Sequence, residues 1–201
     1  MLYVGDPNQR LSTAALPAYA GALRISMSYT FRFGPDVAEM CNDLVDECPL
    51  MFGFGETLRD PPVMSERLAL PSAAEELAVV GFANKDVFRI AEGFLKRQRF
   101  RKVEFLSRKL VELRKQHMDG HRGSGRLMMA GTIHSVKGMT FKDKTVIVHR
   151  GRIRSPEEKR RYLVSLSRIQ SGGRSKLYVY DDPRPAAMDR DDEWDPHVDD
   201  V

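Results

Sequence analysis

The 201-residue sequence has only two cysteines and no long apolar run. Cys41 and Cys48 are predicted on one helix about two turns apart, too far for a disulfide along the helix axis and without metal-ligand spacing. No stretch approaches the ~20 apolar residues that span a bilayer, and residues 1–11 lack the basic and apolar regions of a secretory signal. These absences disfavour a membrane or secreted protein and predict reduced thiols in the cytoplasm or nucleus.

The sequence also lacks a phosphate-binding loop of the G-x-x-x-x-G-K-[ST] type. Residues 120–125 are rich in glycine, but no lysine followed by serine or threonine closes them. The β- and γ-phosphates of a nucleotide and its Mg²⁺ therefore have no cradle in this chain. We expect the chain not to hydrolyse ATP alone through such a loop.

Composition and charge predict one globular domain with a basic surface. The chain is 42% hydrophobic and 30% charged, with a net charge of +4. Its last thirteen residues carry seven acidic side chains and one arginine, so the rest of the chain is strongly basic. We predict a folded domain over residues 1–182 and a disordered acidic tail over residues 183–201. The basic charge of this domain suits a polyanionic partner, and the other explanation of this charge is a well-solvated surface.

Short β-rich runs alternate with amphipathic stretches, which predicts an α/β domain with a parallel sheet covered by helices. The predicted strands are residues 2–4, 25–28, 77–81, 103–106, 128–133, 145–149 and 177–180. One helix is predicted to begin at Pro35, another at Pro156, and a third over residues 109–117 with Ser107 as its cap. Residues 50–73 show no period, which predicts a long surface connection.

Polar residues follow apolar runs twice near the start of the chain. The sequence GDPNQ, residues 5–9, comes directly after the first predicted strand, and α/β sheets bind ligands at the carboxyl ends of their strands. Taken alone, it is explained as well by an ordinary turn. Arg32, within SYTFRFGP at residues 28–35, precedes a helix start, where a guanidinium can bind phosphate. For the isolated residue, a surface arginine between two core aromatic side chains is the simpler explanation.

Residues 131–141, GTIHSVKGMTF, place hydroxyls, an imidazole, an ammonium and a glycine in one turn between two β-rich runs. Thr132, His134, Ser135 and Lys137 can donate hydrogen bonds to a sugar-phosphate backbone. An ordinary turn can hold several of these residue types, but the full set at the end of a strand favours contact with nucleic acid.

Residues 162–168, YLVSLSR, predict a helix with Leu163 and Leu166 facing the core. Arg168 then lies near the carboxyl end of the helix, where arginine can satisfy the last backbone carbonyls. For the isolated residue, this capping role is the better explanation.

Together and in this order, the four segments resemble motifs III, IV, V and VI of superfamily 1 helicases. The resemblance covers residues 2–180, and motifs III, V and VI are its specific parts. It implies a RecA-like second motor domain of an ATP-dependent helicase that moves on single-stranded RNA or DNA. The segments at residues 138–141 and 163–168 look like helicases of positive-strand RNA viruses, and residues 31–35 look like the UvrD branch. We favour a viral replicative enzyme.

The resemblance implies catalytic roles for Gln9, Arg32 and Arg168. Gln9 would sense the γ-phosphate, and the two arginines would stabilise charge on the transferring phosphoryl group. The implied nucleotide-binding residues are Gly5, Asp6, Gln9, Arg32, Gly138, Thr140 and Arg168. ATP with Mg²⁺ would be shared with an N-terminal RecA-like domain in cis or in trans. The implied contacts to the nucleic-acid strand are Thr132, His134, Ser135 and Lys137.

The sequence departs from the family pattern in places. UvrD-like helicases have a ribose-binding glutamate where this chain has Thr140, so that contact is not implied. They also place a base-stacking aromatic soon after motif III, where Tyr19 is the one weak candidate. The chain starts at motif III, which suggests a fragment of a longer polypeptide. The basic residues 96–126 extend the nucleic-acid path or form a solvated helix face.

Two other functions remain open from the sequence. The chain could be a non-catalytic nucleic-acid-binding or replication-complex protein derived from a helicase. It could also be a different phosphate-handling α/β enzyme in which the motifs are coincidental. ATP hydrolysis stimulated by a strand separates the first from a motor, and substitution of Arg32 and Arg168 separates the second.

Overall fold

The computed structural model describes residues 29–44, 51–65, 76–97, 100–111, 126–150, 153 and 155–181. The strands predicted at residues 2–4 and 25–28, Cys48, the loop at residues 120–125 and the predicted acidic tail lie outside the described residues. In the described part of the chain, no helix is long and apolar enough to cross a membrane.

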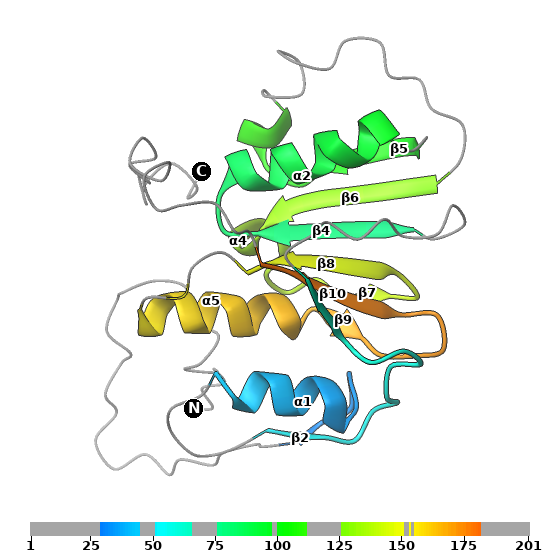
Figure 1. The fold of residues 1–201 in the computed structure, drawn as a ribbon, viewed down its shortest axis with the longest axis vertical. Coiled ribbons are helices and arrows are strands. Elements are labelled where there is room, and N and C mark those ends of the chain that lie inside the picture. Colours follow the sequence, from blue (N-terminus) through cyan, green and yellow to red (C-terminus); the bar gives the residue numbers. More distant parts are fainter. Residues whose placement is uncertain are drawn as a thin grey trace, which may run out of the picture.

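A six-stranded parallel sheet forms the centre of the molecule (Figure 1). In spatial order its strands are β3 (Val63–Ser65), β10 (Lys176–Tyr180), β8 (Thr145–His149), β4 (Leu77–Gly81), β6 (Arg126–Thr132) and β5 (Phe100–Phe105). The predicted strands at residues 77–81 and 145–149 are confirmed with their bounds, and those at 103–106, 128–133 and 177–180 are confirmed with shifted ends. The predicted RecA-like α/β class agrees with this parallel sheet and its flanking helices.

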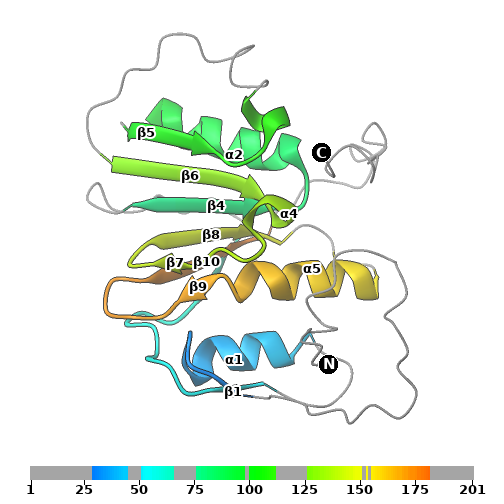
Figure 2. The same cartoon turned by 180° about the vertical axis from the view of Figure 1, so that it is seen from behind.

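Both faces of the sheet are buried because its central strands alternate apolar side chains between two cores. Ala78 and Val80 of β4 belong to one core cluster, and Leu77 and Val79 belong to the other. The first cluster includes side chains of α1 (Pro35–Asn42) and α5 (Pro156–Leu166), and the second includes side chains of α2 (Asn84–Arg97). The helices are therefore divided between the two faces, as Figures 1 and 2 show.

Local sequence explains where two of the helices begin. Helix α1 (Pro35–Asn42) starts with proline at its first turn, and α5 (Pro156–Leu166) has a full capping box. In that box, the Ser155 hydroxyl accepts from the Glu158 N–H at 3.2 Å, and the Glu158 carboxylate accepts from the Ser155 N–H at 2.9 Å. These two bonds satisfy backbone donors that a helix otherwise leaves without partners.

Two helix predictions need adjustment at their ends. Helix α1 ends at Asn42, with Asp43 as its C-cap, so the predicted apolar stripe is too long and Leu44 lies beyond the helix. Residues 108–111 are helical, and the Ser107 hydroxyl accepts from the Leu110 N–H at 3.2 Å, which confirms the predicted cap. The rest of that predicted helix lies outside the described residues.

The predicted surface connection at residues 50–73 is partly wrong, because it contains two short strands. Strand β2 (Phe52–Gly53) pairs in parallel with β1 (Tyr29–Thr30), and β3 forms one edge of the main sheet. Segments of two or three residues are too short to show a two-residue period. A second small pair joins β7 (Phe141–Lys142) to β9 (Ile169–Gln170).

Candidate functional site

Arg168 lies buried just past the end of α5. Its side chain is 2% exposed. The Nε donates to the Val164 carbonyl at 2.9 Å, and Nη2 donates to the Ser167 hydroxyl at 2.8 Å. Nη1 reaches the Met139 carbonyl at 3.5 Å, which ties α5 to the segment before β7. The capping geometry named as an alternative is therefore present, and a role at phosphate stays a prediction.

Arg32 approaches the same helix end from the start of the described chain. Its Nη1 donates to the Ser167 carbonyl at 2.9 Å, and its own carbonyl accepts from the Ser171 N–H at 3.0 Å. The side chain is only half-buried, unlike that of Arg168. The neighbouring Phe33 is a core residue, whereas Phe31 is exposed, so Arg32 stands at the border between core and surface.

The two arginines thus meet at one residue, although 135 positions separate Arg32 from Ser167 in the sequence. Arg32 contacts the Ser167 backbone, and Arg168 contacts the Ser167 hydroxyl. Helix α5 ends here, and its last carbonyls carry partial negative charge that the two guanidinium groups balance. The Arg32 guanidinium uses one of its five N–H groups in the bond to Ser167. An anionic ligand at this point would have two fixed positive charges nearby.

The segment after β6 forms a tight turn at the carboxyl edge of the sheet. Thr132 is the N-cap of the short helix α4 (Ile133–Val136), and its hydroxyl accepts from the Ser135 N–H at 3.5 Å. The Ser135 hydroxyl donates back to the Thr132 carbonyl at 2.9 Å. Thr132 is buried, and His134 and Ser135 are half-buried. The residues predicted to contact the nucleic-acid strand therefore lie together in this segment. The Thr132 hydroxyl already accepts a hydrogen bond within the turn.

The exposed part of this segment begins at Lys137. Lys137, Gly138 and Thr140 are all exposed, and Gly138 has a φ of +84°, which glycine adopts without steric cost. The chain then turns back so that the Phe141 N–H donates to the Arg168 carbonyl at 2.8 Å. One segment of about ten residues therefore links the carboxyl edge of the sheet to the arginine pair.

Burial shifts the pKa values of Cys41 and Tyr162, two side chains of the core that contains α1 and α5. Desolvation raises the pKa of the Cys41 thiol to about 12, and the positive charge of Arg168 opposes this shift. Burial also raises the pKa of the Tyr162 hydroxyl above its ordinary value, against the opposing charge of Arg150. Cys41 is therefore a protonated core thiol near neutral pH, as predicted for a reduced cysteine.

Several predicted site residues lie outside the described residues. Gly5, Asp6 and Gln9 belong to this group, so their position relative to the arginine pair stays a prediction. In the basic stretch at residues 96–126, Arg108 and Lys109 are exposed, and the side chains of the other basic residues are not described.

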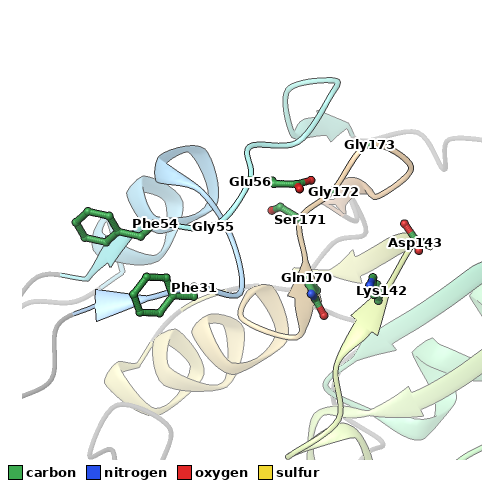
Figure 3. A pocket seen from close by; sticks show the side chains of 10 residues that line it. All are labelled: Phe31, Phe54, Gly55, Glu56, Lys142, Asp143, Gln170, Ser171, Gly172 and Gly173. Atoms are coloured by element: carbon green, nitrogen blue, oxygen red, sulfur yellow. The ribbon is translucent and has the colours of Figure 1, made fainter.

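Figure 3 shows a pocket that was not predicted from the sequence. It has a volume of about 360 Å³ and lies between the β1–β2 pair and the turns next to β7 and β9. Glu56 contributes a carboxylate from the segment without periodicity, and Gly172 and Gly173 come from the turn after β9. No motif marks these residues, because the pocket forms only when distant turns pack together.

No family model and no curated protein matches this sequence. Among solved structures, one of the PRRSV helicase is similar, with 17% sequence identity and a TM-score of 0.34. The match covers 80% of this chain but only 24% of that chain, so this chain spans about a quarter of that helicase's length. A likeness at this level assigns no function, and the proposals below depend on the site residues themselves.

Proposed function

We propose that this chain is the second motor domain of an ATP-dependent superfamily 1 helicase that acts on single-stranded RNA or DNA, with a viral replicative role favoured by its motif details. ATP and Mg²⁺ would be held between this domain and a first RecA-like domain that supplies the Walker A and Walker B residues. The chain alone would be inactive.

The observation that carries this proposal is the convergence of Arg32 and Arg168 on Ser167. Phosphoryl transfer develops negative charge on the transferred group, and fixed guanidinium groups stabilise that charge. Arg32 is placed to act directly because its side chain is partly exposed. Arg168 would have to exchange its bonds to the Val164 and Met139 carbonyls for phosphate oxygens when the two domains close.

The same segment that approaches Arg168 supports coupling to a nucleic-acid strand. Lys137 and the exposed side of the turn after β6 would contact the backbone of the strand. A shift of Arg168 would be transmitted through Met139 and Phe141, whose backbones bond to this arginine. Domain closure on ATP would then move the strand contacts as one unit, which is a hinge mechanism for translocation.

The test pairs the chain with a RecA-like domain that carries Walker A and Walker B motifs and measures ATP hydrolysis with and without single-stranded RNA or DNA. We expect hydrolysis stimulated by the strand, and a loss of about 10³-fold in rate for Arg32→Ala. The matched control is Arg174→Ala, because that side chain is 81% exposed and pairs only with Asp143 among described residues. Unchanged hydrolysis in Arg32→Ala would contradict the proposal.

A second candidate is a non-catalytic nucleic-acid-binding protein derived from a helicase. The burial of Arg168 favours it, since all the bonds of its guanidinium given above go to groups of this chain. In this case the arginine would act only as a helix cap. Strand binding without stimulated hydrolysis in any pairing would support this candidate.

A further inference from the structure

The pocket beside Arg32 has the size of a small-molecule site. Its volume of about 360 Å³ falls within the ~300–1,000 Å³ that is usual for ligand pockets. It is attached to the arginine site, because the Ser171 N–H in its wall donates to the Arg32 carbonyl. The backbone of Arg32 therefore adjoins the pocket wall, and its guanidinium donates to the Ser167 carbonyl.

Several polar side chains of the pocket have no side-chain partner among the described residues, whereas Asp143 pairs with Arg174. Ser171 is 8% exposed, and its hydroxyl has no hydrogen-bond partner there. No side-chain bond or ion pair to another described residue is found for Glu56, Lys142 or Gln170, and all three line the pocket. A buried hydroxyl without a partner is destabilising, and a ligand with a suitable polar atom would provide one.

A larger neighbouring groove is rich in charge and shares Lys142, Asp143 and Gly173 with this pocket. Lys176 lies 3.7 Å from the Asp60 carboxylate, and Lys144 pairs with Glu76. Several charged groups of this groove are therefore paired, whereas no bond or ion pair of the Glu56 side chain is found among the described residues.

One side of the pocket is aromatic. Phe31 is 78% exposed and Phe54 is 60% exposed, and their ring centroids are 6.1 Å apart. Gly55 brings these two strands together, because a Cβ there would lie 2.7 Å from the Phe31 carbonyl oxygen. Figure 3 shows both rings on one side of the pocket, Lys142 and Asp143 on the opposite side, and Glu56 with Ser171 between them. Exposed aromatic rings beside unpartnered polar groups fit a planar ligand with a polar edge.

We propose that this pocket binds the base and ribose of a ribonucleotide, with Glu56 and Ser171 bonded to the ribose hydroxyls and Phe54 and Phe31 against the base. The assignment rests on the proposed function for the position of the phosphates, which would point toward Arg32. The Glu56 carboxylate accepts hydrogen bonds only, and a ribose offers two adjacent hydroxyl donors. The pocket should therefore prefer a ribonucleoside to a 2′-deoxyribonucleoside.

The experiment titrates the ¹⁵N-labelled full chain with adenosine, with 2′-deoxyadenosine and with inorganic tripolyphosphate, each to millimolar concentration. Adenosine should shift the amide signals of Glu56 and of residues 170–173, and it should bind more tightly than 2′-deoxyadenosine. Tripolyphosphate should shift the signals around Arg32 and Ser167. Because adenosine has no phosphate, the pocket and the arginine pair are examined separately.

Substitutions identify the groups that recognise the ribose. Glu56→Gln should weaken adenosine binding about tenfold, because a charged hydrogen bond is lost, and should remove the preference over 2′-deoxyadenosine. Ser171→Ala should weaken adenosine binding less. Glu39→Gln, an exposed change on α1, is the matched control and should bind as the parent chain does. Both Glu56 and Glu39 are exposed, so neither change should disturb the fold.

The outcomes separate this inference from the proposed function. Shifts with tripolyphosphate but none in the pocket with adenosine would overturn the inference and leave the motor function standing. Shifts in the pocket with adenosine but none near Arg32 with tripolyphosphate would support the pocket and count against the motor function. Equal binding of the two nucleosides, unaffected by Glu56→Gln, would overturn the assignment of Glu56.

Discussion

The two faces of the central sheet are packed with different kinds of residue. On the face covered by α2, Phe94 and Met128 are among the largest members of the buried apolar cluster, and the buried His149 lies 4.0 Å from the Asp86 carboxylate of α2. On the face covered by α1 and α5, the core also encloses Ser165, Ser167 and Arg168. Both faces therefore hold buried polar groups, whose burial is costly unless they are bonded, and the second face differs in holding a buried arginine. Function is therefore expected to depend on the second face.

The largest expected difference between the faces concerns Arg168. Arg168→Ala should lower the strand-stimulated hydrolysis rate of the paired domains by about 10³-fold or more, because a stabilising charge is lost. Arg168→Lys should not restore the rate, since an ammonium lacks the planar fork of donors. The check is steady-state ATPase activity, with circular dichroism to show that each variant is folded. Full activity in Arg168→Ala would reduce this residue to a helix cap.

Substitutions on the face covered by α2 should change the free energy of unfolding and leave strand binding unchanged. Phe94→Ala removes a fully buried ring from the α2 side and should lower the free energy of unfolding by about 3–5 kcal/mol. At a temperature where the variant stays folded, the affinity for single-stranded RNA should match that of the parent chain. Urea denaturation and fluorescence anisotropy measure the two effects. A selective loss of strand binding would break the division between the faces.

The thiol at Cys41 should make stability depend on pH in the alkaline range. Its pKa is raised from 9.0 to about 12 in the folded chain, so the unfolded thiol releases its proton first. This contribution to stability is complete below about pH 9 and is lost as pH rises from about 9 to 12, by at most ~1.4 kcal/mol per pH unit. Thermal denaturation across this range is the measurement, with Cys41→Ala as the control. An unchanged slope in Cys41→Ala would contradict the assignment.

The smallest expected effect is that of Lys137, the exposed residue that follows α4. Lys137→Ala should weaken binding of single-stranded RNA severalfold and reduce the slope of log affinity against log salt by about 0.7, the value for one phosphate contact. Anisotropy titrations at several salt concentrations measure this slope. Lys85→Ala at the start of α2 is the control on the other face. Equal losses in both variants would show that the basic surface binds strands without a defined path.

The sequence predicted the central strands because both of their faces are buried. The runs at Leu77–Gly81 and Thr145–His149 are short, β-branched and continuously apolar, which is the signature of a strand inside a parallel sheet. Strands β2 and β3 were missed because two or three residues carry no period. The end of α1 was missed because residues beyond Asn42 continue the apolar spacing after the helix stops.

The site was predicted only in part, and for physical reasons. The motif pattern placed Arg32 and Arg168 in one site, and the structure brings both to Ser167. The burial of Arg168 depends on how α5 packs against the segment at Met139, which no local pattern encodes. Glu56 could not be predicted as a pocket residue, because most of the other lining residues come from turns 86 to 117 positions away in the sequence.

The central claim is that both guanidinium groups engage the transferring phosphoryl group. The most direct measurement follows the side-chain Nε–H signals of Arg32 and Arg168 by NMR while the paired domains bind ADP with aluminium fluoride, a mimic of the transition state. Both signals should shift, and that of Arg168 should lose the signature of its bond to the Val164 carbonyl. An unchanged Arg168 signal in a complex that has bound the mimic would contradict the claim.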